Sequence, residues 1–562
     1  MTGNGEGHCV PESSKPSFAD LFTPKLVTVL REGYGSAAFR ADLLAGLTVA
    51  IVALPLSLAI AVACGVSPER GLYAAIIGGF IVSALGGSRF QIGGPAGAFI
   101  VLIAATVLRH GLDGLLLAVL LSGVILIAAG LLRFGTYVKY IPFPVTVGFT
   151  AGIGLIILAS QIRPALGLVV DGPEPAGLLE KLPLLWQALP SVNTPALAIA
   201  AGTAGLILAQ RRWLPKWPGM LIAIVLASLA VFVLRLPVET VVSVFGELPR
   251  GLPMPRLPDL SQDRVMAVLP DAFAFALLGA IESLLSASVA DGMTGRRHRS
   301  NCELVAQGGA NIASALFGGL PVTGTIARTA TNVRAGARGP VAGLAHAAFL
   351  LVFLLLAGPV LAYIPLAALA GVLVVIGWTM IEHRAIAILA RTSAGDFAVF
   401  AVTLGLTVFR DLAEAIVAGF ALGAILFIRR MSETTSVTGD PPLAATDQAD
   451  RLAPYSPDEA GDSGTVVYRV TGTLFFGAAA SVGAVLDRIA ERRTTLILDL
   501  SDVPLIDSTG AHMLAGLAER SQRRGTGLVL RGTTPAMRSV LAGYGIGEPA
   551  VRFEAADGQS GS

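Results

Sequence analysis

Two glycine-broken polar segments lie inside long apolar stretches of this sequence. The first reads GGSRFQIGGPAGAF (residues 86–99) and the second reads GGLPVTGTIART (318–329). A helix that begins after such a break leaves its first amide N–H groups without intrahelical partners and carries a partial positive charge. Two such helix ends that face each other form a site for an anion. The paired breaks therefore predict an anion-binding site.

The small and charged residues near the breaks are the candidates for contact with an anion. Gly93, Gly94 and Gly97 on one side and Gly324 on the other would let a ligand approach the backbone. Arg328 lies about one turn after the second break, where insertion scales give a cation a cost of ~2.5–3.5 kcal/mol. We therefore expect Arg328 to face water, a carboxylate or the anion. The alternative is that the glycines make helix contacts of the small-xxx-small type.

One carboxyl group stands in the middle of an apolar helix. The stretch LLGAIESLLSASVADG (277–292) holds Glu282, and Ser286 follows one turn later on the same face. An ionisable group inside a membrane is a functional candidate by default, and burial disfavours its charged form, so Glu282 is a candidate proton carrier. The alternative is a fixed ion pair between Glu282 and Arg328. The two interpretations agree if the pair can open and close.

The composition indicates that these segments belong to a membrane protein. Of 562 residues, 54% are hydrophobic and 14% are charged, and the mean hydropathy is +0.73. Soluble domains carry about 25% charged residues. Three scattered cysteines do not make a disulfide framework, and the six histidines show no metal-ligand spacing. We therefore expect an α-helical polytopic membrane protein without cofactor or metal.

The apolar stretches predict fourteen spans in two sets of seven. An odd number of spans inverts the second set, so we expect two inverted repeats, over about 41–235 and 270–430. The expected spans lie near 43–63, 71–85, 95–109, 114–132, 143–160, 195–209, 218–235, 271–291, 302–317, 323–335, 340–360, 365–380, 396–410 and 411–429.

Basic residues indicate the orientation of the transmembrane domain (41–430). With a cytoplasmic N-terminal segment (1–40), the even-numbered loops should be basic. They include GRRHRS (295–300), EHRAIAILAR (382–391) and the pair Arg429 and Arg430. Both termini are therefore expected in the cytoplasm, with the protein in the inner (plasma) membrane.

The C-terminal part changes in composition. Residues 431–463 are polar and contain proline and glycine, which is typical of a linker. Strands expected at 465–476, 494–503, 527–532 and 551–555 alternate with helices at 478–492, 508–523 and 535–544. This alternation predicts a small α/β domain over 464–556, followed by a short tail (557–562).

These motifs resemble the sulfate permease (SulP) family of anion transporters over essentially the whole chain. The resemblance rests on GGSRFQIGGPAGAFI (86–100), ADGMTGRRHRSNCELVAQGGANIASALFGG (290–319) and TGTIARTATNVRAGA (323–337), and LDLSDVPLIDSTGAHML (498–514) resembles a STAS domain. It implies a core and a gate domain, a homodimer, and an anion site between the third and tenth spans. The substrate-binding residues that it implies are Ala96, Gly97, Ser286, Gly324, Thr325 and Arg328, with Glu282 as the proton-coupling residue.

Departures from particular branches of the family bear on coupling and regulation. Sodium-coupled bicarbonate members have an aspartate at the position of Glu282 and a threonine at the position of Ile326. An isoleucine side chain cannot coordinate a cation. The resemblance therefore favours protons as the coupling ion, as in the bacterial dicarboxylate and fumarate branch.

Thr509 takes the place of the serine that is phosphorylated in anti-sigma factor antagonists. The interpretation we prefer is that Asp507, Ser508 and Thr509 cap a helix.

The predicted function is secondary active transport of a small anion, sulfate-type or C4-dicarboxylate, coupled to protons, by movement of the core against the gate. The alternatives are a bicarbonate transporter, a passive anion channel and a membrane-anchored STAS signalling protein. The absence of a G-x-x-x-x-G-K-[ST] phosphate loop argues against an ATP-driven pump, and we expect no enzyme activity. The expected partners are the anion, the proton, the bilayer, a second copy and a cytoplasmic STAS-binding protein, but no nucleic acid.

Overall fold

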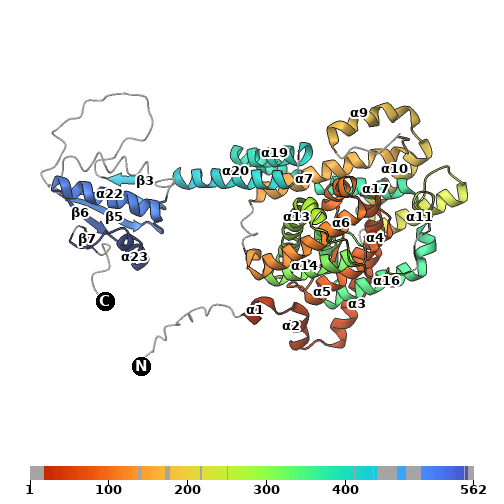
Figure 1. The fold of residues 1–562 in the computed structure, drawn as a ribbon, viewed down its shortest axis with the longest axis horizontal. Coiled ribbons are helices and arrows are strands. Elements are labelled where there is room, and N and C mark those ends of the chain that lie inside the picture. Colours follow the sequence, from red (N-terminus) through yellow and green to blue (C-terminus); the bar gives the residue numbers. More distant parts are fainter. Residues whose placement is uncertain are drawn as a thin grey trace. The chain divides into compact units, whose positions relative to one another are not determined.

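The chain forms two units, Met1–Phe420 and Ala421–Ser562, in a computed structural model (Figure 1). The structure describes residues 18–136, 142–170, 177–214, 218–247, 249, 251–410, 412–433, 436–439, 465–475, 495–549 and 551–554. The helix expected over 478–492, the tail 557–562 and most of the linker 431–463 lie outside these ranges.

The regular elements described in the first unit are helices, apart from a strand of two residues at each break. Its short strands are β1 (Gly93–Gly94) and β2 (Thr323–Gly324), and α20 (Leu412–Glu433) continues into the second unit. The helices are α1 (Phe18–Phe22), α2 (Lys25–Arg31), α3 (Ser36–Ala63), α4 (Glu69–Tyr73), η1 (Ala74–Gly78), α5 (Gly79–Leu85), η2 (Gly97–Phe99), α6 (Ile100–Leu131), η3 (Phe134–Thr136), α7 (Phe143–Ser160), α8 (Ile162–Leu166), α9 (Leu178–Ala188), η5 (Leu189–Ser191), α10 (Thr194–Trp213), α11 (Gly219–Leu234), α12 (Val241–Phe245), α13 (Gln262–Thr294), α14 (Ser300–Leu316), α15 (Ile326–Arg334), α16 (Val341–Leu361), α17 (Leu366–Met380), α18 (His383–Thr392) and α19 (Ala394–Phe409).

Several of these helices are long and apolar enough to cross a membrane. Among the described residues six pass by length and composition, and a seventh candidate, α9 to α10, is bent by 115° at its break. Large apolar side chains such as Phe232 (76% exposed) and Leu356 (78% exposed) lie on the outside, which suits a lipid environment. The expected third and fourth spans are joined within α6, where Gly111 leaves the helical conformation at φ 68°.

The helices of the first unit pack in two groups. In one group α6 contacts α13 and α14, and α3 contacts α15 and α16; in the other, α7 contacts α19 and α17, and α10 contacts α17 and α11. The two groups meet where α3 also contacts α17 and α11. Each group draws elements from both halves of the sequence, which is what two repeats of one design would give. The first group contains both breaks, so it positions the predicted site.

Close helix contacts hold the first group together. A Cβ built on Gly123 of α6 would lie 2.5 Å from the carbonyl oxygen of Gly308 on α14, and one built on Gly308 would lie 2.4 Å from that of Gly123. Only glycine fits such a reciprocal contact, and close approach is how helices gain dispersion contacts where lipid supplies no hydrophobic driving force. This contact fixes α14 against α6.

The second unit is a five-stranded sheet with helices. The strands lie in the order β3 (Ser436–Gly439), β4 (Thr465–Thr471), β5 (Thr495–Asp502), β6 (Gly527–Arg531) and β7 (Arg552–Glu554). The pairs from β4 to β7 are parallel, and β3 joins antiparallel, from inside the segment expected as linker. α22 (Ser508–Arg524) and α23 (Pro535–Gly543) agree with the helices predicted from the sequence.

The reciprocal glycine contact predicts a stability effect. Gly123→Ala should lower the free energy of unfolding by about 1–3 kcal/mol, because the added methyl group collides with the carbonyl of Gly308. The measurement is the thermal unfolding midpoint of the purified protein in detergent. Gly205→Ala is the matched control, because a Cβ there meets nothing within 4 Å. Equal midpoints for the two variants would contradict the proposed tight contact.

Candidate anion-binding site

The two breaks meet as a two-residue antiparallel ladder. Gly93 pairs with Gly324 and Gly94 pairs with Thr323, so β1 of the first half lies directly beside β2 of the second half. Gln91 packs so closely that a Cβ on Gly324 would lie 1.9 Å from its Nε2 atom. The side-by-side position of the two breaks, which the sequence predicted, is therefore confirmed by the strand pairing.

A helix begins directly after each strand of this ladder. After β1 the chain enters η2 and then α6, and after β2 it enters α15, which has nine residues and is too short to cross a bilayer. Neither start has a side-chain cap: Ala96 and Thr325 precede the helices in extended conformations. The first-turn amides of both helices are thus left for another partner, and both ends carry partial positive charge.

Side chains from neighbouring helices satisfy the backbone around the breaks. The amide of Asn311 pairs with both backbone groups of Val322, at 2.8 and 2.9 Å, as a neighbouring strand would. Thr329 Oγ1 accepts from the N–H of Ile92 at 3.2 Å, and Asn332 donates to the carbonyl of Phe90 at 2.9 Å. In a membrane interior these bonds are required, because no water replaces them. They hold the crossing in one conformation.

Glu303 is a buried carboxyl group near the crossing that the sequence analysis did not single out. One oxygen accepts from the N–H groups of Gly87 (2.8 Å) and Ser88 (3.1 Å), and the other accepts from Gln91 (2.8 Å) and Gln307 (2.9 Å). It is fully buried on α14. A glutamate among apolar residues of a spanning helix was the available signal. Its partners make it a brace for the segment before β1.

Arg328 lies at the crossing, as predicted, and its side chain turns towards α3. The side chain is 1% exposed, and Nη2 donates to Ser57 Oγ at 3.2 Å and to the carbonyl of Pro95 at 3.1 Å. Gly94 makes room for it, because a Cβ there would lie 2.0 Å from Nη1. Nε and Nη1 have no hydrogen-bond partner among the described residues. The guanidinium group of Arg328 is therefore buried beside the ladder, and its Nε and Nη1 atoms remain available as hydrogen-bond donors.

Glu282 lies on the face of α13 that contacts the crossing. On the same helix the carbonyl of Gly279 accepts from Thr323 at 3.0 Å, and Ser283 accepts from Gln91 at 2.6 Å. Glu282 itself is half-buried, and its Oε2 atom is buried without a hydrogen-bond partner among the described residues. Within those residues no ion pair joins it to Arg328, so the structure does not contain the fixed pair of the alternative interpretation.

The other predicted residues fall into two kinds. Ala96, Thr325 and Gly324 are buried at the ladder, and the hydroxyl of Thr325 has no partner among the described residues. Gly97 is half-buried at the start of η2. Ser286 is fully buried and donates to Thr329 at 3.1 Å, which places it in the bracing network.

Thr509 lies far along the chain from this site. It is exposed in the first turn of α22, where Asp507 is the cap and accepts from the N–H of Gly510 at 2.8 Å. The capping interpretation therefore holds for Asp507, and Thr509 is left as an exposed hydroxyl group.

Comparisons with known proteins agree with this architecture. The model of the sulfate permease family matches residues 39–403, and that of the STAS domain matches residues 456–549. YvdB of Bacillus subtilis, whose name refers to sulfate transport, is 38% identical over 522 residues, covering 92% of this chain and 95% of its own. The bicarbonate transporter BicA of Synechocystis is 33% identical, covering 88% of each chain.

A solved structure shows the same fold at lower identity. The murine anion transporter Slc26a9, in the inward-facing state, superposes with a TM-score of 0.81 at 20% identity, covering 96% of this chain and 92% of that one. The crossing of two broken segments thus lies in a helical transmembrane domain that is followed by a STAS domain. The chain belongs to the sulfate permease family and is a multi-pass membrane transporter of anions.

Proposed function

We propose that this protein is a secondary active transporter that binds its anion at the β1–β2 crossing and moves a proton with it on Glu282. The anion lies between the starts of α6 and α15, with Arg328 as the positive charge behind the ladder. Transport follows from movement of the helix group that contains the crossing (the core) against the group of α7, α10, α11, α17 and α19 (the gate).

The unused donors of Arg328 support this site most strongly. Two guanidinium nitrogen atoms, Nε and Nη1, are buried without a partner among the described residues, beside helix starts whose first amides are uncapped. An unsatisfied buried donor costs roughly 1–3 kcal/mol, and more for a charged group. A bound anion offers acceptor oxygens and negative charge at the place where both are missing. The arrangement therefore suits an oxyanion better than a neutral solute.

The membrane potential explains why a proton carried on Glu282 would assist anion uptake. Uptake against a negative interior costs ~2.3 kcal/mol per 100 mV for each net negative charge moved. One proton on Glu282 removes this term for a monoanion and halves it for a dianion. The apolar side chain of Ile326, 37% exposed at the first turn of α15, offers no ligand for sodium, which supports protons as the coupling ion.

The substrate that we propose is a small oxyanion. The names of the two relatives refer to sulfate and bicarbonate. The resemblance to the dicarboxylate and fumarate branch keeps C4-dicarboxylates as a second candidate class. Competition for uptake by a panel of these anions at two pH values separates the classes.

The assembly and orientation complete the proposal. Both termini lie in the cytoplasm and the protein is a homodimer in the inner membrane, as the basic loops and the family resemblance imply. Arg211 and Arg212 at the end of α10 and Arg334 at the end of α15 would then face the cytoplasm. A passive channel remains the rival within the family, and it predicts flux without saturation or counterflow.

Removal of the charge of Arg328 tests the site. Arg328→Gln should raise the apparent KM for anion uptake into proteoliposomes roughly tenfold to hundredfold, because a charged hydrogen bond is worth about 1.5–3 kcal/mol. Glutamine keeps an N–H donor for Ser57 and Pro95, which limits structural damage. Arg334→Gln, at an exposed position on the same helix, is the control and should leave KM unchanged.

A second variant displaces the guanidinium group of Arg328 through the neighbouring Gly94. Gly94→Ala should also raise KM, because its Cβ would collide with Nη1 of Arg328. Thermal unfolding separates this effect from loss of the fold. If Arg328→Gln folds normally and transports with wild-type KM, Arg328 is not part of the site. If anion flux through the wild-type protein does not saturate, the protein is better described as a passive channel.

Proton coupling is tested at Glu282. Glu282→Gln should still bind and exchange the anion, because the amide is neutral like the protonated acid, but an inward proton gradient should no longer accelerate uptake. Uptake with and without a pH gradient, at equal anion concentration, is the measurement. Acid stimulation of wild-type size in this variant would exclude Glu282 as the proton carrier.

A further inference from the structure

One nitrogen of the Arg328 guanidinium group has two acceptors within the protein. Nη2 donates to the hydroxyl oxygen of Ser57 at 3.2 Å and to the carbonyl oxygen of Pro95 at 3.1 Å. A guanidinium group is planar and rigid, so two acceptors on one nitrogen fix the direction of the other two nitrogens. Nε and Nη1 are the atoms left without a partner among the described residues. Their orientation therefore depends on Ser57 and Pro95.

The two acceptors come from different parts of the fold. Pro95 directly follows β1, and its acceptor is a backbone carbonyl of the first break. Ser57 lies on α3, outside both breaks, and its side chain is fully buried. A substitution at Pro95 leaves a carbonyl in place, whereas a substitution at Ser57 can remove the acceptor. Ser57 is thus the side chain through which the sequence sets the orientation of Arg328.

The hydroxyl group of Ser57 is held in place and in direction. It donates its single proton to the carbonyl oxygen of Ala53, one turn earlier on α3, at 2.8 Å. Its lone pairs are then left to accept from Arg328. Helix α4 fixes the backbone of Ser57, because a Cβ on Gly71 would lie 2.0 Å from the carbonyl oxygen of Ser57. Arg328 therefore meets an acceptor that cannot easily move.

A second residue of α3 shows what a serine or threonine does there without this role. Thr48 Oγ1 donates to the carbonyl oxygen of Leu44 at 2.8 Å, which is the same bond back to the preceding turn, and its side chain is exposed. Such bonds are common in helices and need no functional reason. The feature that sets Ser57 apart is the buried charge from which it also accepts a hydrogen bond.

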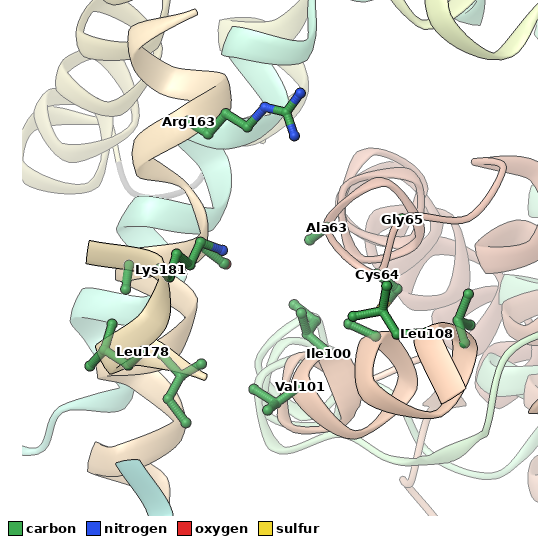
Figure 2. Close-up of a pocket in the computed structure, with 14 residues that line it drawn as sticks. Ala63, Cys64, Gly65, Ile100, Val101, Leu108, Arg163, Leu178 and Lys181 are labelled. Carbon is green, nitrogen blue, oxygen red and sulfur yellow. The ribbon is translucent and has the colours of Figure 1, made fainter. Parts of the chain in front are cut away.

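Helix α3 borders the gate. Besides α15 and α16 it contacts α17 and α11. Its C-terminal end lines a cavity of about 300 Å³, and Figure 2 shows Ala63 and Cys64 on one side of this cavity and Leu178 of α9 on the other. Ser57 therefore ties the guanidinium group of Arg328 to the core helix that meets the gate.

We propose that Ser57 is the positioning residue of the anion site: it holds Arg328 so that Nε and Nη1 remain directed at a small oxyanion. The inference rests on the proposed transport function. Ser57 does not touch the anion and acts only through Arg328. Without its hydroxyl group, Nη2 keeps one acceptor, the guanidinium group can turn about the remaining bond, and the anion loses part of its hydrogen bonding.

Removal of the hydroxyl group tests the proposal. In proteoliposomes of the full-length protein, with sulfate and with bicarbonate as probes, Ser57→Ala should raise the apparent KM about threefold to tenfold and keep the maximal rate within about twofold of wild type. Ser57→Cys keeps the size of the side chain with a weaker acceptor, so its KM should lie between those of wild type and Ser57→Ala. Thr48→Ala is the matched control on the same helix and should leave KM unchanged. Thermal unfolding in detergent without anion identifies any variant that does not fold.

A second background separates positioning from a purely structural role. Arg328→Met has no N–H group for Ser57, so adding Ser57→Ala to it should change uptake at anion concentrations far below KM by less than about twofold. An equal loss in both backgrounds, or wild-type KM in whichever of Ser57→Ala and Ser57→Cys folds, would overturn the role of Ser57 and leave the proposed function intact. Absence of saturable wild-type uptake of either probe would instead refute the proposed oxyanion transport.

Discussion

The pairing of Gly93 with Gly324 is the contact on which the rest of the transmembrane architecture depends. Two helices that begin inside a membrane expose backbone groups that lipid cannot satisfy. The ladder pairs the two breaks with each other, and Asn311, Thr329, Asn332 and the carboxylate of Glu303 complete the hydrogen bonds around them. The side chains that brace the crossing thus come from α14 and α15, which ties its conformation to the position of these two helices.

The hydrogen bonds around the crossing leave several polar groups near it without a partner among the described residues. The first-turn amides of α6 and α15 point away from their own helices by geometry, and two donors of Arg328, the hydroxyl of Thr325 and one oxygen of Glu282 lack partners among the described residues. The donors favour an anion and the carboxyl group can take a proton. The side chains that brace the crossing, Asn311, Thr329, Asn332 and Glu303, differ from the unpartnered groups that we propose for the anion, so in this proposal an anion can leave without loosening the crossing. This separation suits a rigid core that moves against a gate.

Much of this site could be predicted from the sequence, and the reason is physical. Arg328 and Glu282 stand out because ionisable side chains are costly in a membrane, and the glycines and prolines stand out because they interrupt two apolar runs at corresponding positions. Side-chain direction could not be predicted: Arg328 points back to Ser57, and Ser286 bonds to Thr329. Glu303 was missed because its role depends on N–H groups of a loop more than 200 residues away. In the C-terminal unit, β3 was missed because its four residues, SVTG inside a polar linker, are too few to show strand periodicity.

The most direct measurement of the central claim is the position of a bound anion. A structure determined with selenate or bromide, whichever competes for uptake, would locate the ion by its anomalous scattering. We expect the ion between the starts of α6 and α15, beside the Gly93–Gly324 ladder and within the field of Arg328. A competing anion found elsewhere, with the crossing unoccupied at saturating concentration, would contradict the account.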